Sequence, residues 1–287
     1  MLVVHSVEEV RKIAASWRER GLSVGLVPTM GYLHEGHESL MRAAGRDNDR
    51  VVVSIFVNPT QFGPNEDLAS YPRDMEHDLA RCEALGVALV FAPEPEGMYP
   101  EGFATSVVVS GLTEGLCGRS RPTHFQGVCT VVSKLFNIVG PDKAYFGRKD
   151  AQQLAVIRRM AEDLNMRVEV VGCPIVREPD GLAKSSRNAY LSPEGRRAAL
   201  VLSRAVRKAG ELAASGERDS AAIERAMRAV FDAEPLARVD YIEIVDTRTL
   251  KPVTALGEET LVAVAAVVGT SRLIDNAVIA LDGQPVI

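Results

Sequence analysis

The chain has 287 residues, a length that suits two domains better than one. Hydrophobic residues make up 46% of it and charged residues 25%, an ordinary globular composition that excludes a disordered chain. The formal net charge of −5 argues against a large nucleic-acid-binding surface, which would need clustered basic residues.

The N-terminus and the cysteines favour a cytoplasmic protein. The N-terminus lacks a basic segment followed by an apolar one, and no apolar run reaches the length of a membrane span. The four cysteines show no C-x-x-C spacing, which favours free structural thiols in a reducing compartment. We therefore expect a cytoplasmic protein that binds neither a membrane nor nucleic acid.

The first 175 residues alternate strand-like and helix-like segments. The expected strands cover residues 23–27, 51–57, 87–91, 144–146 and 168–172. The expected helices cover residues 7–20, 36–44, 74–85, 128–138 and 151–164. Continuous Val-rich strands are typical of a parallel sheet that is buried on both faces. The pattern predicts an α/β fold with a Rossmann-like doubly wound parallel sheet, which binds ligands beyond the carboxyl ends of its strands.

Residues 28–37 follow the first of these strands and open a helix. The segment places His34 and His37 three residues apart, on one face of the first helical turns. A helix N-terminus favours phosphate, and Gly31 and Gly36 allow a ligand to approach the backbone closely. The pattern G-x-x-H-x-G-H is similar to the HIGH signature of nucleotidyltransferases. The alternative is a pair of solvent-facing histidines on an ordinary amphipathic helix.

Polar residues also follow the second strand. Asn58 and Gln61 lie in a neutral loop whose amides can both donate to and accept from the hydroxyls and carbonyls of a ligand. An Asn-Pro turn would explain Asn58 equally well, but it does not explain Gln61.

Residues 147–153 follow the fourth strand and start another helix. Lys149 lies where a phosphate would meet the helix N-terminus, and Gln153 lies one turn further along the same crevice. Asp150 suits an N-cap, but it could also hold Mg²⁺ or a ribose, and these alternatives stay open.

Two further basic segments could reach an anion. Residues 184–188 lie in a loop that places two hydroxyls between Lys184 and Arg187, similar to the KMSKS loop of HIGH-type enzymes. Residues 118–127 form a basic loop before a helix, which could contact an anion or close over the site as a lid. His124 in that loop is equally explained as a structural histidine.

The C-terminal region has a different pattern. Ser192-Pro193 predicts the N-cap and first residue of a helix over residues 193–214, and a second helix fits residues 220–231. Strands are expected at residues 239–245 and 261–268, with a short final strand near residues 277–281. We therefore expect a Rossmann-like ligand-binding domain at residues 1–176. A smaller C-terminal α+β domain at residues 177–287 would act as a lid.

Taken together, these segments resemble the pantoate–β-alanine ligase (pantothenate synthetase) family of the HIGH-type nucleotidyltransferase superfamily, over nearly the whole chain and in order. The matching motifs are Val27-Pro28-Thr29-Met30-Gly31 with His34 and His37, Phe56-Val57-Asn58-Pro59 with Gln61-Phe62, Tyr71-Pro72-Arg73, Arg121-Pro122 with His124-Phe125, Ser133-Lys134-Leu135-Phe136-Asn137, Gly147 with Lys149-Asp150 and Gln152-Gln153, Ser185-Ser186-Arg187-Asn188, and Arg272-Leu273-Ile274-Asp275-Asn276. Arg148 departs from the family pattern, in which we expect an acidic residue in many relatives, and Lys184 is a position that varies.

The resemblance implies ATP-dependent condensation of (R)-pantoate with β-alanine to pantothenate through a pantoyl-adenylate, with release of AMP and pyrophosphate. The domain at residues 1–176 would bind ATP and pantoate. Mg²⁺ would accompany the ATP, and the protein would be a homodimer. Implied catalytic residues are His34, His37, Lys149 and Arg187. Implied ATP-binding residues are Met30, Gly31, Tyr32, Leu33, His34, Glu35, Gly36, His37, Gly147, Arg148, Lys149, Asp150, Val176, Lys184, Ser185, Ser186 and Arg187. Implied substrate-binding residues are Gln61, Gln153 and Asn58.

Three other functions compete with this one. A cytidylyltransferase-like nucleotidyltransferase shares G-x-x-H-x-G-H but keeps the nucleotide on its product, and the paired glutamines and second domain argue against it. A catalytically silent nucleotide-binding protein is disfavoured by the intact His34, His37, Lys149 and Arg187. A zinc hydrolase fits poorly, because the two histidines do not have H-E-x-x-H spacing.

Overall fold

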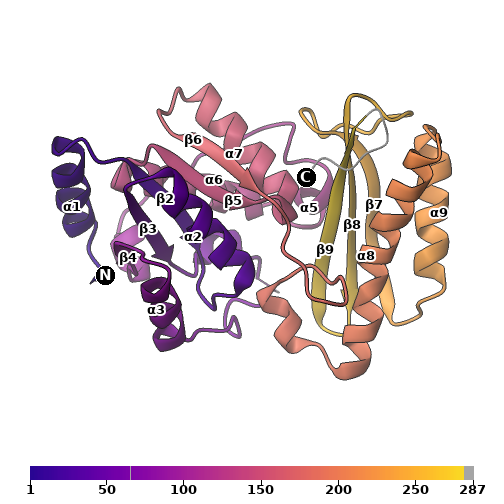
Figure 1. Cartoon of the computed structure of the whole chain (residues 1–287), viewed down its shortest axis with the longest axis horizontal. Helices are drawn as coiled ribbons and strands as arrows, with labels where there is room; N and C mark the ends of the chain where they lie inside the picture. Colours follow the sequence, from indigo (N-terminus) through magenta and orange to yellow (C-terminus); the bar gives the residue numbers. More distant parts are fainter. Residues whose placement is uncertain (65, 281–287) are drawn as a thin grey trace. The chain divides into compact units, whose positions relative to one another are not determined.

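The computed structural model describes residues 1–64 and 66–280, and the chain divides into two compact units (Figure 1). Unit 1 comprises Met1–Ser110, Arg121–Arg148 and Val156–Cys173. Unit 2 comprises Gly111–Ser120, Lys149–Ala155 and the chain from Pro174 onward. Each unit is built around its own sheet.

Unit 1 contains a six-stranded parallel sheet in the order β1-β4-β3-β2-β5-β6. The strands are β1 (Leu2–Val4), β2 (Val24–Thr29), β3 (Arg50–Ile55), β4 (Leu89–Phe91), β5 (Lys143–Gly147) and β6 (Glu169–Cys173). The chain runs outward from β2 to β3 and β4, then returns to place β5 on the other side of β2. This reversal is the arrangement of a doubly wound sheet, so the predicted fold class is confirmed.

Helices cover both faces of this sheet. They are α1 (Val7–Glu19), α2 (Glu35–Asp47), α3 (Met75–Ala84), the short α4 (Pro95–Met98), α6 (His124–Val139) and most of α7 (Ala151–Asp163). Helices α1 and α6 pack against each other and β2. Helices α2 and α3 share a second core with the alternate strand residues Val27, Val51 and Val53. Because successive strand residues point to opposite faces, the apolar runs of β2 and β3 serve both layers.

Unit 2 packs two helices on one face of an antiparallel sheet, β7-β8-β9. Its elements are α5 (Leu116–Ser120), α8 (Pro193–Ala214), α9 (Ser220–Asp232), β7 (Ala237–Asp246), β8 (Glu259–Val268) and β9 (Ser271–Ala280). Helix α8 begins as predicted, because the Ser192 hydroxyl accepts the N–H of Gly195 at 3.0 Å and Pro193 takes the first helical position. The small α+β arrangement expected from the sequence is confirmed.

Several predicted boundaries were wrong. The final strand is ten residues long and begins at Ser271, and Leu281 at the end of the predicted strand lies outside the described residues. The polar residues Asp275 and Asn276 interrupt the apolar pattern expected of a strand. They lie within β9 because both side chains are buried with partners inside the unit. Helix α6 starts at His124 rather than residue 128.

Three segments expected as loop or left unassigned are ordered elements. Leu116–Ser120 forms α5, which overlaps the start of the predicted basic loop, and Ser186–Tyr190 forms a 3-10 helix (η3), which overlaps the end of the predicted anion-binding loop. Leu2–Val4 forms the edge strand β1, which is too short for a periodic signal and gains its pairing from β4.

Candidate active site

The turn after β2 is held in place by a buried carboxylate from α3. Asp78 is 1% exposed, and its two oxygens accept the N–H groups of Tyr32 and Leu33, each at 2.7 Å. Tyr32 has a φ of 52° and Gly31 a φ of 85°. A Cβ on Gly31 would lie 2.9 Å from the Asp78 carboxylate, so only glycine fits there.

This turn delivers two histidines to the N-terminus of α2. His34 is the N-cap, and its Nδ1 accepts the N–H of Gly36 at 3.1 Å. The Nδ1 of His37 accepts the N–H of His34 at 3.3 Å, and the two ring centroids lie 4.1 Å apart. A nitrogen that accepts a hydrogen bond does not carry the ring proton, so each neutral imidazole is an Nε2–H donor. Two donors therefore add to the positive end of the helix dipole.

Helix α3 fixes α2 through a second set of polar contacts. His77 Nδ1 lies 3.3 Å from the Asp78 carboxylate, and Arg81 Nε donates to His77 Nε2 at 2.8 Å. Arg81 also pairs with Glu38 on the first turns of α2. The histidine-bearing turn is therefore locked at its backbone and again at the helix that follows.

Gln61 lies at the end of a short 3-10 turn, η1 (Pro59–Gln61), that follows β3. Its Nε2 donates to Met30 Sδ at 3.2 Å, and its Oε1 accepts from Asn58 Nδ2 at 3.1 Å. The structure thus brings Gln61 beside the first residue of the histidine turn. A polar amide next to the histidine turn suits a small ligand with hydroxyl and carboxylate groups.

Asn58 is 1% exposed, and its amide is used within the protein. Besides Gln61, it donates to the Gly127 carbonyl at 3.2 Å and accepts from the Tyr99 hydroxyl at 2.7 Å. Its geometry is that of a group that holds Gln61 in place, and its predicted contact with substrate stays a prediction.

The start of α6 clamps the same turn from the other side. A Cβ on Gly127 would lie 2.4 Å from the Thr60 carbonyl oxygen, so α6 approaches η1 closely. The Gln61 carbonyl lies 2.9 Å from His124 Nδ1 and accepts from Arg121 at 3.3 Å. His124 is therefore a structural histidine in this structure, and Arg121 has a defined partner on η1.

Unit 1 therefore gathers several predicted residues at one end of its sheet. Strands β2 and β5 are neighbours, and β3 follows on the far side of β2 whereas β6 follows on the far side of β5. The strand order therefore reverses between β2 and β5, which marks the switch point of the sheet. Gly147 ends β5 there and Arg148 follows it, and the turn of residues 30–37 follows β2. Gln61 joins them through Met30.

Unit 2 holds the remaining predicted residues. Lys149 lies in a 3-10 turn, η2 (Arg148–Asp150), directly before α7, and its carbonyl accepts from Asn276 at 2.7 Å. Lys149 and Ser185 line one hollow, as the lining residues are Lys149, Leu182, Ala183, Ser185, Asn188, Leu202, Leu273, Ile274 and Asp275. The structure thus brings together the lysine and the first of the two predicted serines.

The two adjacent glutamines of α7 have separate surroundings. Gln152 is buried, donates to the carbonyls of Leu112 and Gly115 at 2.9 Å each, and accepts the N–H of Cys117 at 2.9 Å. It is fully committed to the 112–117 turn. Gln153 is half-buried on the neighbouring helix face, where a substrate role stays a prediction.

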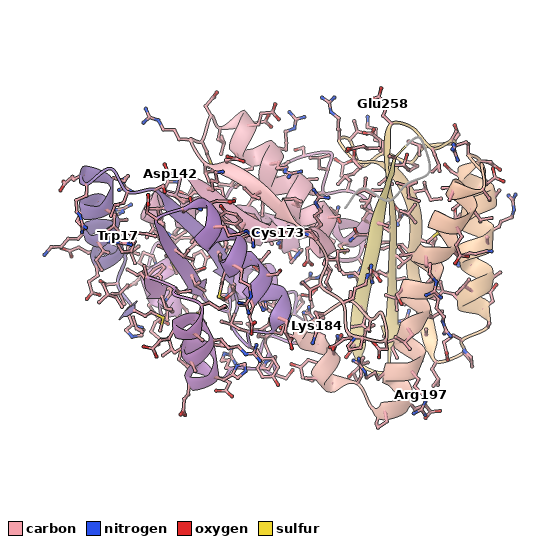
Figure 2. All side chains as sticks on the ribbon, viewed as in Figure 1. Trp17, Asp142, Cys173, Lys184, Arg197 and Glu258 are labelled. Carbon is pink, nitrogen blue, oxygen red and sulfur yellow. The ribbon has the colours of Figure 1, made fainter. Side chains whose placement is uncertain are left out.

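The segment around residues 176–188 is a short hairpin followed by η3. Figure 2 labels Lys184 on this segment. Val176 accepts the N–H of Lys184 at 2.9 Å, and Lys184 Nζ pairs with Glu178 at 2.9 Å. The Ser185 hydroxyl accepts the N–H of Arg187 at 3.3 Å and so caps η3. Val176, Lys184, Ser185 and Arg187 are therefore parts of one ordered segment.

The four cysteines are free and buried. Burial raises the pKa of the Cys82 and Cys129 thiols to about 12, so these groups are unreactive, as expected for structural thiols. In the part of the chain that the structure describes, no three His, Cys, Asp or Glu side chains gather as a metal site. None of the helices in residues 1–64 and 66–280 has the length and apolar character of a membrane span.

Two supporting residues of this site gave no usable signal in the sequence. Asp78 lies within a predicted amphipathic helix, and its distance of 46 residues from Tyr32 hides their contact. Asn276 belongs to a matching motif that assigns it no role. Sequence spacing alone could not have found either contact.

Known proteins resemble the chain over its whole length. A family described as Pantoate-beta-alanine ligase matches residues 2–278. A relative named pantothenate synthetase from Ruminiclostridium cellulolyticum is 59% identical over 276 residues, covering 96% of this chain and 98% of the relative. One from Heliobacterium modesticaldum is 60% identical over 276 residues, covering 95% and 98%.

Solved structures agree. The pantothenate synthetase from Thermus thermophilus superposes with a TM-score of 0.91 at 51% identity, covering 96% of this chain and 98% of that one. The pantoate-beta-alanine ligase from Francisella tularensis, complexed with beta-gamma ATP and beta-alanine, gives a TM-score of 0.79 at 32% identity, covering 96% and 97%. The chain therefore belongs to the pantoate–β-alanine ligase family of enzymes.

Proposed function

We propose that the chain condenses (R)-pantoate with β-alanine to pantothenate, using ATP and passing through a pantoyl-adenylate. The observation that carries the proposal is the paired-histidine cap of α2. The Nδ1 atoms of His34 and His37 each accept a backbone N–H, so the ring proton lies on Nε2 at a helix N-terminus. Such an arrangement suits the charge on a triphosphate.

In the first half-reaction, a pantoate carboxylate oxygen bonds to the α-phosphorus of ATP, and the bond from that phosphorus to pyrophosphate breaks. His37 would act as the general acid toward the developing charge, with His34 beside it. No covalent protein nucleophile is required, because the substrate supplies the attacking oxygen. The rate enhancement would come from orientation, worth up to about 7–11 kcal/mol, and from charge stabilisation.

In the second half-reaction, the β-alanine amine attacks the acyl carbon of the adenylate and AMP leaves. Gln61 and Gln153 would hold the hydroxyls and carboxylate of pantoate, and Gln61 would also face β-alanine. The position of Gln61 beside Met30 supports this placement. Asn58 would support Gln61 from behind.

The nucleotide would be held by the residues of the histidine turn and by those of unit 2. The proposed contacts are Met30 to His37, Gly147 to Asp150, Val176, and Lys184 to Arg187. Lys149 supplies a point charge, and Arg148 adds a second cation in sequence. Mg²⁺ usually binds one or two carboxylates together with substrate phosphates, and Asp150 is the carboxylate beside Lys149 that fits this role. The bound Mg²⁺ would neutralise part of the phosphate charge.

We further propose a cytoplasmic homodimer in which residues 177–287 shield the reactive adenylate from water. Residues 1–176 would carry most of the ATP and pantoate contacts. Sedimentation at equilibrium would test the homodimer.

The test of the function is coupled detection of AMP with each substrate omitted in turn. Pyrophosphate release should require pantoate, and AMP release should require β-alanine as well. Pyrophosphate release from CTP with the nucleotide kept on the product would instead favour a cytidylyltransferase. Replacing Gln153 with Ala should raise the pantoate requirement far more than the β-alanine requirement, and equal effects on both would contradict its placement.

A further inference from the structure

The middle of β9 carries polar side chains where a buried strand would normally be apolar. Asp275 is 2% exposed and Asn276 is 5% exposed, although β9 otherwise packs with α8 and β8. Burying such groups is unfavourable unless they are hydrogen-bonded. Both have partners on segments far away in sequence.

Asn276 binds the backbone of Lys149, the lysine proposed to contact phosphate. Its Nδ2 donates to the Lys149 carbonyl at 2.7 Å, across 127 residues of sequence. Lys149 is in η2, a single 3-10 turn with poor intrinsic stability. A side-chain bond to the middle of that turn therefore fixes the point from which the Lys149 side chain leaves the backbone.

Asp275 holds the hairpin that leads into η3. Its carboxylate accepts both Nη1 and Nη2 of Arg177, at 2.7 Å and 2.9 Å, and the N–H of Asn276 at 2.8 Å. Arg177 also donates to the Gly181 carbonyl at 3.1 Å, closing the hairpin on itself. A two-bond arginine–carboxylate pair is directional, so it sets the orientation of the hairpin as well as its place.

Asn276 thus contacts one segment of unit 2 that the sequence associates with phosphate, and Asp275 contacts the hairpin that leads into the other. Ser185 follows the hairpin, and Asn188 of η3 donates to the Ala183 carbonyl at 3.1 Å. Lys149, Ser185 and Asp275 line the same hollow. The spacing between the lysine and the serine is therefore set by one dipeptide of a rigid strand rather than by either loop.

We propose that Asp275 and Asn276 are positioning residues for ATP: they hold Lys149 and the 184–187 segment in register with each other without contacting substrate themselves. The inference deepens the proposed function and rests on it. Its signature is a defect in ATP use that exceeds any defect in β-alanine use, because β-alanine enters only after the adenylate has formed.

The experiment compares four full-length proteins: the unchanged chain, Asn276→Asp, Asp275→Asn and Thr260→Val. The first two variants keep the shape of the side chain and remove, respectively, the donor to Lys149 and the charge that pairs with Arg177. Thr260 is the matched control, a buried β8 residue whose hydroxyl accepts the Gly257 N–H at 2.9 Å away from both segments. Steady-state pyrophosphate release gives kcat and the KM for ATP, AMP release gives the KM for β-alanine, and thermal melting gives Tm.

We expect Asn276→Asp to lower kcat/KM for ATP by about tenfold or more, and Asp275→Asn by several-fold, with the KM for β-alanine within about twofold. Thr260→Val should lower Tm comparably while its kinetic constants stay within about twofold. Unchanged ATP kinetics in both β9 variants, or an equal loss in Thr260→Val, would overturn the proposal.

A replacement variant and a binding measurement complete the experiment. If Asn276→Asp does not fold, Asn276→Ser takes its place, and the same kinetic criterion applies. Calorimetric titration of ATP into each protein separates the two claims. An unchanged chain that binds ATP but releases no pyrophosphate with pantoate refutes the proposed function, whereas weaker ATP binding in the β9 variants still supports the anchoring role.

Discussion

The two units hold the residues proposed to contact phosphate in different ways. In unit 1, the two histidines cap a helix through contacts that span three residues or fewer, although Asp78, 46 residues from Tyr32, anchors the turn before them. In unit 2, Lys149 and the hairpin of Arg177 depend on partners 127 and 98 residues away. The local caps can be predicted from the sequence, whereas the contacts with distant residues become visible only in the folded chain.

The largest expected effect comes from removing the charged side chain of Lys149 in unit 2. Lys149→Ala should slow pantoate-dependent pyrophosphate release by about 10²–10³-fold, because a pre-placed cation on the phosphates is lost. Circular dichroism should show a normally folded protein. Lys143→Ala is the control, since Lys143 Nζ only pairs with Glu169 at 3.4 Å at the other end of β5. A near-full rate in Lys149→Ala would refute the assigned role.

The corresponding change in unit 1 releases the backbone of the histidine turn. Asp78→Asn replaces one of two acceptors by a donor that faces an N–H group, so unfolding free energy in urea should fall by about 2–3 kcal/mol. We also expect kcat to fall at least about tenfold, because the turn that positions His34 and His37 is no longer held by Asp78. Asp74→Asn, at the exposed N-cap of the same helix, should leave kcat unchanged. Equal kcat in both variants would contradict the locking role of Asp78.

A smaller effect should follow from separating α6 from η1. Gly127→Ala forces a Cβ toward Thr60 and Gln61, which should cost about 1–3 kcal/mol of stability and raise the KM for pantoate. Gly210→Ala in α8 meets nothing within 4 Å, so it should stabilise the protein by about 0.5–1 kcal/mol. Urea unfolding and substrate titrations measure both. A tolerated Gly127→Ala would show that the approach of α6 to η1 is not needed for substrate binding.

The smallest expected effect concerns the unfolding free energy at acidic pH, to which Glu66 of unit 1 contributes. Burial raises the pKa of Glu66, but hydrogen bonding and the charge of Arg121 outweigh it and hold the pKa below its ordinary value of 4.5. A carboxyl with a lowered folded pKa stabilises the protein above its unfolded pKa and loses that contribution as pH falls through the folded pKa. After allowance for solvent screening, the pair is worth at most about 1 kcal/mol. The stability advantage over Glu66→Gln should therefore shrink below about pH 4.5 in urea titrations, and a constant advantage would exclude this pair as its source.

The sequence predicted those features whose causes lie close together in the chain. Ser192-Pro193 indicated the start of α8, and the Val-rich segment of β3 indicated a doubly covered sheet, because capping and burial patterns are local. Asp78 and Asn276 gave no such signal, since each acts on a backbone group that only folding brings near. The length of β9 was underestimated for the same reason: its polar residues look like loop until their partners are known.

The path of the chain limits how this protein can be divided. Residues 111–120 belong to unit 2 although unit 1 flanks them on both sides, and Ser120 bonds there to Asp240 of β7 at 3.0 Å. A fragment cut at residue 176 would retain α5 and Gln152 but lose the strands on which α5 rests. Expressing either half alone, or swapping the C-terminal half between relatives, would thus leave a piece of one unit attached to the other. Domain-exchange engineering would have to move residues 111–120 and 149–155 together with the C-terminal half.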